Sequence, residues 1–341
     1  MHRKRLMIGA RKRTFASLIL SGKVTVNRMK LASLATVLWL AIALPAISEA
    51  PVVMKRLTNV IDSYPQFSKD GKLLLFQSNR SGKTQIYVSK ADGTEIRQLT
   101  YLDFPAAVPC WSPDMSRIVF AGEPAGHSEI FVMNADGSGI VQLTRTNGDD
   151  SHPHWSANGS RIMFNSSRMT PDPAADWSKQ WHELFSMKPD GSGVLQHTRL
   201  RTVCTYGSFS PDMKHIVYRK VIEGPAFQWD LSAIGRNSEV FVANADGSNE
   251  VNLSNNAAFD GWPVWSPDGK RIAFSSNRAG PANTGQIFVV NADGSGLRQL
   301  TSGPGGFAQP SWSWDGRRIV AYQNWEIAEY EYGNISLIEF N

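Results

Sequence analysis

The sequence predicts an all-β fold, a six-bladed β-propeller closed into a ring by its N-terminal strand. Three observations support this prediction. A short anchor of one aromatic residue, Ser and a turn occurs six times, and each anchor begins a pattern of four short strands. The two ends of the repeat region supply complementary parts of one repeat. Four strands at a period of about 45 residues are typical of one propeller blade per repeat.

Residues 265–301 show one repeat in full. Asp-Gly turns lie between alternating runs, which is the strongest short-range signal for a hairpin. In the first turn Pro restricts φ, Asp accepts hydrogen bonds from its own turn and Gly tolerates positive φ. The expected elements, in order, are the end of a first strand (265–266), a turn (267–269), a second strand (270–276), a third strand (286–290), a turn (293–296) and a fourth strand (297–301).

The six anchors set the number of blades. A single blade cannot bury both faces of its sheet, so neighbouring blades must provide the core. The intervals between anchors are 44, 44, 54, 56 and 47 residues. The anchors are FSKDG (67–71), WSPDM (111–115), WSANG (155–159), FSPDM (209–213), WSPDG (265–269) and WSWDG (312–316).

The ends of the repeat region predict how the ring closes. Val52 to Asn59 matches the fourth strand of a repeat, whereas the last repeat stops after a third strand, Ile335 to Phe340. We therefore expect the N-terminal strand to pair with the last blade, which removes the free edge of an open sheet.

The first 50 residues differ from the rest. They carry nine Lys/Arg and one acidic residue, whereas the remainder carries 26 Lys/Arg and 29 Asp/Glu, so the formal charge of +5 comes from this leader. A basic segment before the apolar run 31–46 predicts a secretory signal, or an uncleaved N-terminal anchor. We expect residues 1–50 to be this leader, 51–341 to be the propeller, and the protein to be periplasmic. The remainder is not basic, so no nucleic-acid partner is predicted.

Cys110 and Cys204 are the two cysteines. They fall on blades 2 and 4, which are not neighbours, so we expect two separate thiols. Neither lies at zinc-site spacing from other ligands.

Blades 3 and 4 contain long inserts between their second and third strands, Met169 to His182 and Val221 to Ser238. In an up-and-down blade these loops share one face with the loops that pass to the next blade, and the Asp-Gly turns lie on the opposite face. Function concentrates in loops on a rigid scaffold, and Trp is enriched at binding hot spots. The alternative is that these aromatic residues only pin the loops to the body. The candidate binding residues in the inserts are Trp177, Trp181, Phe227, Trp229 and Asp230.

Blades 1, 3 and 5 each carry an Asp three residues before the proline of the first strand and an Arg at the end of the second strand, always 18 residues apart. Blades 2, 4 and 6 have neither. This coincidence favours structural ion pairs within blades over a ring of free carboxylates that binds a cation. An exposed pair contributes about 0–1 kcal/mol, and a partly buried bidentate pair orients a loop better. We expect Asp62→Ala to weaken the loops of blade 1 about as much as Arg80→Ala does. The predicted pairs are Asp62 with Arg80, Asp150 with Arg168, and Asp260 with Arg278.

His152 and His154 flank Pro153 and would face the same way in a strand. With Asp149 or Asp150 they would offer ligands for a metal. Other blades place ordinary packing residues in the same two positions, so no metal site is predicted. We interpret both histidines as lining the channel mouth and keep them as candidate ligand-binding residues.

No motif for catalysis or a cofactor is recognisable. The Gly-Ser-Gly runs are repeated hairpin turns rather than nucleophile elbows. A phosphate-binding loop, a dinucleotide fingerprint and the zinc motif HExxH are all missing. The sequence therefore predicts no cofactor and favours a protein that is not an enzyme.

The repeated W-S-P-D-G-x-x-I-x-F, S-x-R, I-[FY]-V-x-N-A-D-G-S and Q-L-T segments resemble TolB-like periplasmic propellers across 52–341. In TolB itself the propeller docks a peptidoglycan-associated lipoprotein, and the separate α/β domain that precedes it has no counterpart before these repeats. The repeats also resemble the propellers of oligopeptidases and those of oligogalacturonate lyases. The lyases use a metal that several His hold on the propeller.

The sequence and this resemblance predict an exported, non-catalytic propeller. We expect it to bind an envelope protein or lipoprotein through the face that carries the blade 3 and blade 4 inserts, with membrane contact only through an uncleaved leader. The alternative is a glycan-binding or glycan-cleaving propeller.

Overall fold

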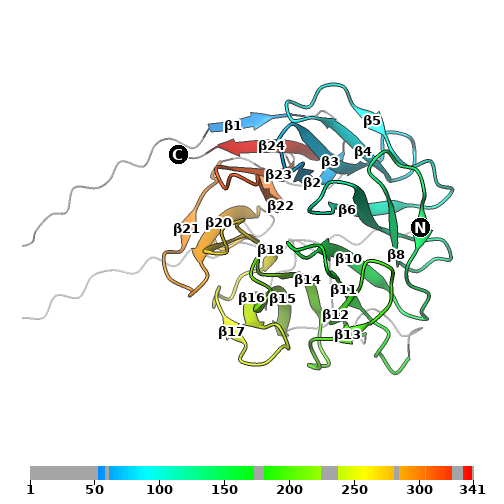
Figure 1. The fold of residues 1–341 in the computed structure, drawn as a ribbon. Coiled ribbons are helices and arrows are strands. Elements are labelled where there is room, and N and C mark those ends of the chain that lie inside the picture. The colour runs from blue at the N-terminus through cyan, green and yellow to red at the C-terminus, as the bar shows by residue number, and fades with distance from the viewer. Residues whose placement is uncertain are drawn as a thin grey trace, which may run out of the picture. The chain divides into compact units, whose positions relative to one another are not determined.

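A computed structural model describes residues 53–57, 61–172, 180–223, 237–279, 284–303, 305–324 and 333–339. The chain divides into Met1–Ser48 and Glu49–Asn341, and every described residue belongs to the second unit. These residues form six four-stranded sheets (Figure 1). No helix in this part of the chain is long and apolar enough to cross a bilayer.

Each sheet is one blade, and each blade places its strands in the same order. The first strands are β2 (Asp62–Phe67), β6 (Ala106–Trp111), β10 (Asp150–Trp155), β14 (Cys204–Phe209), β18 (Asp260–Trp265) and β22 (Gly306–Trp312). The second strands are β3 (Leu73–Ser78), β7 (Arg117–Gly122), β11 (Ile162–Ser166), β15 (His215–Glu223), β19 (Arg271–Ser276) and β23 (Arg318–Asn324). The third strands are β4 (Gln85–Lys90), β8 (Glu129–Asn134), β12 (Glu183–Met187), β16 (Asn237–Asn244), β20 (Gln286–Asn291) and β24 (Gly333–Glu339). The fourth strands are β5 (Arg97–Gln98), β9 (Val141–Gln142), β13 (Leu195–Gln196), β17 (Val251–Asn252), β21 (Arg298–Gln299) and, for blade 6, β1 (Val53–Arg56).

The first strands meet around the centre of the propeller. Each contacts the first strand of the next blade, and β22 contacts β2, so the series is closed. Figure 1 shows the six sheets arranged about this centre. The predicted six-bladed all-β architecture is confirmed.

The ring closes between the two ends of the repeat region. β1 pairs antiparallel with β24, with Met54 opposite Ile338 and Arg56 opposite Ser336. The Leu57 N–H adds a hydrogen bond of 2.8 Å to the Ile335 carbonyl. Strand β1 therefore occupies the edge of β24 that would otherwise remain free.

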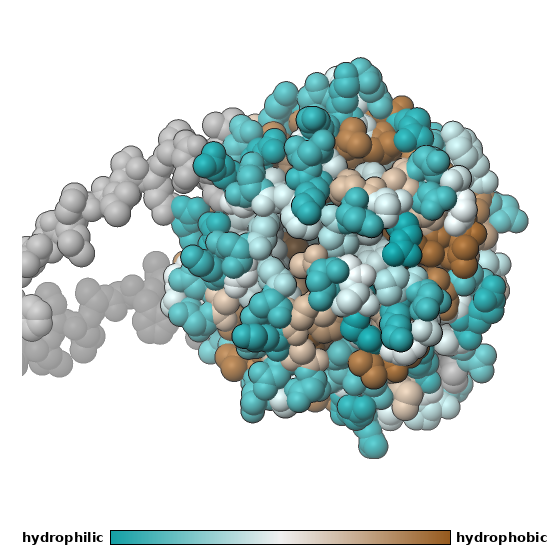
Figure 2. Space-filling view, viewed as in Figure 1, coloured by the Kyte–Doolittle hydropathy of each residue, from teal (hydrophilic) through white to brown (hydrophobic). Residues whose placement is uncertain are grey.

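The hydrophobic core lies between blades rather than within one. Trp111 of blade 2 packs with Leu75, Ile86 and Val88 of blade 1, and the corresponding tryptophans of blades 3, 5 and 6 do the same against their preceding blades. Each fully buried large apolar side chain stabilises the fold by about 1.5–3 kcal/mol. Exposed apolar side chains are scattered, and the face in Figure 2 is mostly hydrophilic with small separate hydrophobic areas.

The second Asp-Gly turn of blades 1 to 4 approaches the backbone of the preceding blade closely. Gly247 has a φ of 85°, and a Cβ added there would lie 1.8 Å from the His197 carbonyl oxygen of blade 3. Gly137 repeats this contact against Leu99 at 2.4 Å. Glycine is therefore required at these turns both by the left-handed backbone and by the neighbouring blade.

Gly247→Ala and Gly82→Ala form a matched test of this contact. Both glycines have positive φ, but a Cβ at Gly82 would meet nothing within 4 Å. We expect Gly82→Ala to cost about 1–2 kcal/mol from backbone strain alone, and Gly247→Ala to cost at least ~2 kcal/mol more because backbone must move. Urea denaturation of both variants measures the difference. Equal losses would contradict the inter-blade contact.

Candidate functional site at the channel mouth

Each first strand contains a β-bulge that faces the centre of the propeller. The register with the second strand shifts by one residue in all six blades, for example between Ser63 and Gln66. A non-glycine residue with φ between 50° and 57° stands at each bulge, and a proline follows it in five blades. Pro is compatible with a bulge because it donates no ladder hydrogen bond. These six residues, named here the channel mouth, are Tyr64, Val108, His152, Tyr206, Trp262 and Gln309.

The channel mouth lines a central cavity of about 110 Å³. A second ring of side chains, two residues further along each strand, lines the same cavity. This second ring consists of Gln66, Cys110, His154, Ser208, Val264 and Ser311. Five of these residues also line a second space of about 120 Å³ that continues toward the Asp-Gly turns.

Side chains of the channel mouth contact each other across the centre. The Tyr64 hydroxyl of blade 1 lies 3.5 Å from His152 Nε2 of blade 3. It also hydrogen-bonds with Tyr206 of blade 4, whose ring lies 5.4 Å from that of Trp262 of blade 5, and the Tyr64 N–H donates to Gln309 of blade 6 over 2.9 Å. The rings of His152 and Tyr206 pack edge to face with centroids 4.3 Å apart. The mouth is therefore narrowed by a connected cluster rather than by six independent side chains.

Burial sets the protonation of this cluster. It raises the pKa of Tyr64 to about 12 and lowers the pKa of His152 to about 3, so both are neutral near pH 7. Burial also lowers the pKa of His182 to about 4, with Arg219 adding to the shift. Arg219, stacked at 4.8 Å on the Phe259 ring, has its pKa lowered to about 10 by burial and remains a cation. The mouth is thus built of neutral aromatic and polar groups with a positive charge behind them.

The two predicted histidines form hydrogen bonds with different partners. His152 Nδ1 lies 3.0 Å from Asn165 Oδ1, and His154 Nδ1 donates to the Trp155 carbonyl over 2.9 Å. Both line the cavity. Among the described residues, no three His, Cys, Asp or Glu side chains gather as a metal site would require. Cys110 and Cys204 are buried free thiols.

Hydrogen bonds join the two described ends of the blade 3 insert. The Trp181 N–H donates to Thr170 Oγ1 over 2.9 Å, and the Thr170 hydroxyl donates back to the Trp181 carbonyl over 3.1 Å. The guanidinium of Arg201 lies 5.5 Å from the Trp181 ring. In blade 4 the insert begins as a longer hairpin, with Glu223 of β15 opposite Asn237 of β16. Trp181 therefore helps to anchor its loop while remaining partly exposed.

The other predicted binding residues, Trp177, Phe227, Trp229 and Asp230, lie outside the described residues. Tyr64, Tyr206, Trp262 and Arg219 were not predicted as site residues from the sequence. The available signal was the position before the first-strand proline, which is present in five of the six repeats. It was recognised as a channel position, but its cross-channel contacts depend on the width of the ring.

The three Asp–Arg pairs have nearly the same geometry in their blades. Arg80 Nη2 lies 2.8 Å from both oxygens of Asp62, and Nη2 of the other arginines lies 2.7 Å from Asp150 and Asp260. Each Asp is fully buried, whereas the arginines are 11–22% exposed. The Asp members therefore differ from the exposed rim residues considered in the sequence analysis.

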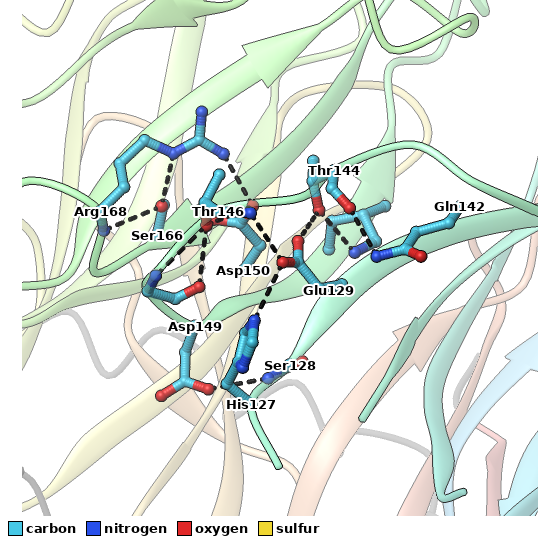
Figure 3. A network of polar contacts seen from close by, with 12 residues as sticks. His127, Ser128, Glu129, Gln142, Thr144, Thr146, Asp149, Asp150, Ser166 and Arg168 are labelled. Atoms are coloured by element: carbon cyan, nitrogen blue, oxygen red, sulfur yellow. Dashed lines mark hydrogen bonds and ion pairs between the residues drawn. The ribbon is translucent and has the colours of Figure 1, made fainter. Parts of the chain in front are cut away.

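Figure 3 shows how the pair in blade 3 connects to blade 2. The Thr146 hydroxyl lies 3.4 Å from Asp150 Oδ2, and the Thr146 N–H donates to Glu129 over 2.8 Å. The Thr144 hydroxyl donates to the other Glu129 oxygen over 2.5 Å. Blades 3 and 4 repeat the contacts of Glu129 with Glu183 and Glu239. The Thr198 hydroxyl donates to Glu183, and the Asn256 N–H donates to Glu239. The loops between blades are thus fixed by buried polar contacts on the insert-bearing face.

The TolB beta propeller domain matches this sequence over residues 104–230 and 223–334. This chain belongs to that family. No curated protein sequence matches it.

Solved structures of the TolB type share the fold of this family member. TolB from Acinetobacter baumannii has a TM-score of 0.59 at 19% identity, over 77% of this chain and 57% of that one, so this chain spans little more than half of its length. A putative TolB from Agrobacterium tumefaciens has a TM-score of 0.61 at 18% identity, over 85% and 98%. An oligogalacturonate lyase in complex with manganese has a TM-score of 0.57 at 14% identity, over 86% and 97%. At these identities the likeness shows the fold alone.

The buried Asp changes what substitution of a pair should do in this TolB-family propeller. Arg80→Ala leaves a carboxylate buried, so we expect a loss of about 3 kcal/mol or more in the free energy of unfolding. Asp62→Ala leaves a guanidinium that can reach water and should cost less, about 1–2 kcal/mol. A double-mutant cycle by urea denaturation should give a coupling energy of about 1–3 kcal/mol. Additive single effects would show that the pair does not interact.

Asp260 predicts a pH dependence of stability. Burial raises its pKa to about 6, against the opposing charge of Arg278. Because an Asp in the unfolded chain has a pKa of about 3.9, this group favours the folded state most at low pH. Its contribution of up to about 3 kcal/mol is lost as pH rises from about 4 through 6. Asp260→Asn should remove this fall, as measured by denaturation at several pH values.

Asp293→Asn is the control for this pH series. The Ser295 hydroxyl holds the pKa of the exposed Asp293 below its usual value. Its contribution therefore falls as pH drops, opposite in sign to that of Asp260. A wild-type curve that matches Asp260→Asn between pH 4 and 6 would contradict the assignment to Asp260.

Proposed function

We propose that this TolB-family chain is an exported propeller that binds a protein partner in the cell envelope through its insert-bearing face. The observation that carries the proposal is the concentration of loop length on that face. Blades 3 and 4 depart there from an otherwise regular repeat, and rigid scaffolds present binding residues on such loops. The basic leader and apolar run of residues 1–50 support export.

The roots of the inserts support recognition of a protein surface. Thr170 holds the Trp181 backbone, the Arg201 guanidinium lies 5.5 Å from the Trp181 ring, and the residue stays partly exposed. A fixed aromatic side chain loses little conformational entropy on binding, which is a property of hot-spot residues. The buried network around Glu129 and Asp150 keeps the neighbouring loops in place, so a partner would meet a preformed rim.

Glycan cleavage has less support than binding. Hydrolysis requires a pair of carboxylates about 5–10 Å apart. Among the described residues that line the channel cavity, none is Asp or Glu. The lining instead favours binding if a glycan is the ligand.

Trp181→Ala tests the proposed docking face, with Trp229→Ala as a second variant chosen from the sequence. A partner is first captured from envelope extract by cross-linking and identified, and its affinity is then measured with purified proteins. We expect each substitution to weaken binding about 30-fold, the loss of one hot-spot residue.

Leu297→Ala provides the matched control, because Leu297 is exposed beside an Asp-Gly turn on the opposite face. It should bind as well as the wild type. Full affinity of both tryptophan variants, or an equal loss in Leu297→Ala, would refute this docking face.

A further inference from the structure

The central channel offers a second binding site that is independent of the inserts. Its cavity lies between the channel mouth and the second ring, and the space beyond the second ring leads toward the Asp-Gly turns. Bulky aromatic side chains surround this outer space, which we name the tryptophan funnel. Its aromatic lining consists of Trp111, Trp155, Phe209, Trp265, Trp312 and Trp314.

The two ends of the channel differ. At the channel mouth Tyr64 contacts residues of blades 3, 4 and 6, so that end is narrowed by cross-channel contacts. The tryptophan funnel is bordered by small turn residues such as Pro113, Ala157 and Pro267. A ligand therefore has its route to the cavity from the turn-bearing face, away from the proposed protein-docking face.

The lining of the cavity restricts the chemistry of its ligand. Among the described residues that line it, none is Asp, Glu, Lys or Arg. A buried charge without a counter-ion is unfavourable by several kcal/mol or more. Burial also lowers the pKa values of His152 and His154, which keeps both rings neutral. The site is thus suited to an uncharged ligand.

Several polar groups of the channel wall lack partners. Within the described residues, Ser208 Oγ and the indole N–H groups of Trp111, Trp155 and Trp265 are buried without a hydrogen-bond partner. Buried polar groups without a partner call for a specific explanation. His154 Nδ1 donates to a backbone carbonyl, which leaves Nε2 as an acceptor. Gln66, Ser208 and Ser311 also line the cavity, so its wall has side chains that can both donate hydrogen bonds to a ligand and accept them.

The size and the aromatic surface narrow the choice further. The cavity of about 110 Å³ and the adjoining space of about 120 Å³ together offer room on the scale of one sugar ring. Tyr206 and Trp262, with ring centroids 5.4 Å apart, provide flat apolar faces beside the polar groups. A pyranose combines hydroxyl groups around its edge with C–H groups on its faces.

We propose that the cavity and the tryptophan funnel form a binding site for one neutral pyranose unit, either free or at the end of a glycan, which enters from the turn-bearing face. Ser208 contributes a hydroxyl to the ligand, and the aromatic rings of the mouth contact the sugar faces. Ser311 lies in both spaces and marks the passage between them.

Calorimetry with glucose, galactose and N-acetylglucosamine tests this site in the whole propeller. At least one should bind with a stoichiometry of one. Ser311→Phe should abolish binding by blocking the passage, and Ser208→Ala should weaken it about 5- to 10-fold through the lost hydrogen bond. Tyr101→Ser, at a 78% exposed residue outside the channel, should bind as the wild type does. Thermal melting of each variant checks that it is folded.

Two further measurements locate the ligand and define its source. Cys110 lines the cavity, so in a Cys204→Ser background the bound sugar should slow its labelling by a small neutral thiol reagent. Burial raises the pKa of Cys110 to about 11, so labelling is followed at alkaline pH. Comparing each monosaccharide with its β-linked oligosaccharide distinguishes a free sugar from a glycan end, and galacturonate tests whether the Arg219 charge favours an acid instead.

Three outcomes would overturn the proposal. These are the lack of saturable binding for all three sugars at their highest soluble concentrations, unchanged binding in folded Ser311→Phe, and unprotected Cys110 at saturation. Stronger binding of galacturonate than of every neutral sugar would also reject it. None of these results bears on protein docking at Trp181, so failure of this site is distinguishable from failure of the proposed function.

Discussion

Packing between blades is the constraint on which the rest of this structure depends. A four-stranded sheet buries its two faces only when a sheet lies on each side, and six such sheets satisfy this condition only as a closed series. The pairing of β1 with β24 completes the last sheet with a strand from the other end of the repeat region. The core clusters then form at every blade boundary, including the one between blades 6 and 1.

Close inter-blade contact also explains why the turns are so regular. In blades 1 to 4 the glycine of the second turn approaches the backbone of the preceding blade, where a Cβ has no room. At three of the blade boundaries, an arginine of one blade stacks on an anchor aromatic of the next, as Arg117 does on Trp155 at 5.0 Å and Arg271 on Trp312 at 4.8 Å. These residues are repeated because the boundary they serve is repeated.

The channel and the rim are where the repeats differ from each other. The same bulge carries Tyr, Val, His, Trp or Gln, and these side chains meet at the centre because the ring is narrow. Six strained positions of about 1–2 kcal/mol each persist there because the surrounding strands determine them. On the insert-bearing face, buried acids and their arginines hold the loops between blades. The blade boundaries are thus nearly the same in every repeat, whereas the channel and the inserts vary. Binding sites can therefore differ in the channel and in the inserts without a change in the packing between blades.

The sequence by itself determined the blade count, the strands, the turns and the closing strand, because each depends on a local pattern that repeats at a fixed period. It also identified the Asp–Arg partners, since their positions recur together. Tertiary structure alone decided that Asp62, Asp150 and Asp260 are fully buried, that Tyr64 reaches three other blades, and that Ser208 Oγ has no hydrogen-bond partner among the described residues. These properties depend on the radius of the ring and on the shift at each bulge. Neither is encoded in the spacing of residues along one blade, because both arise only when six sheets pack against each other.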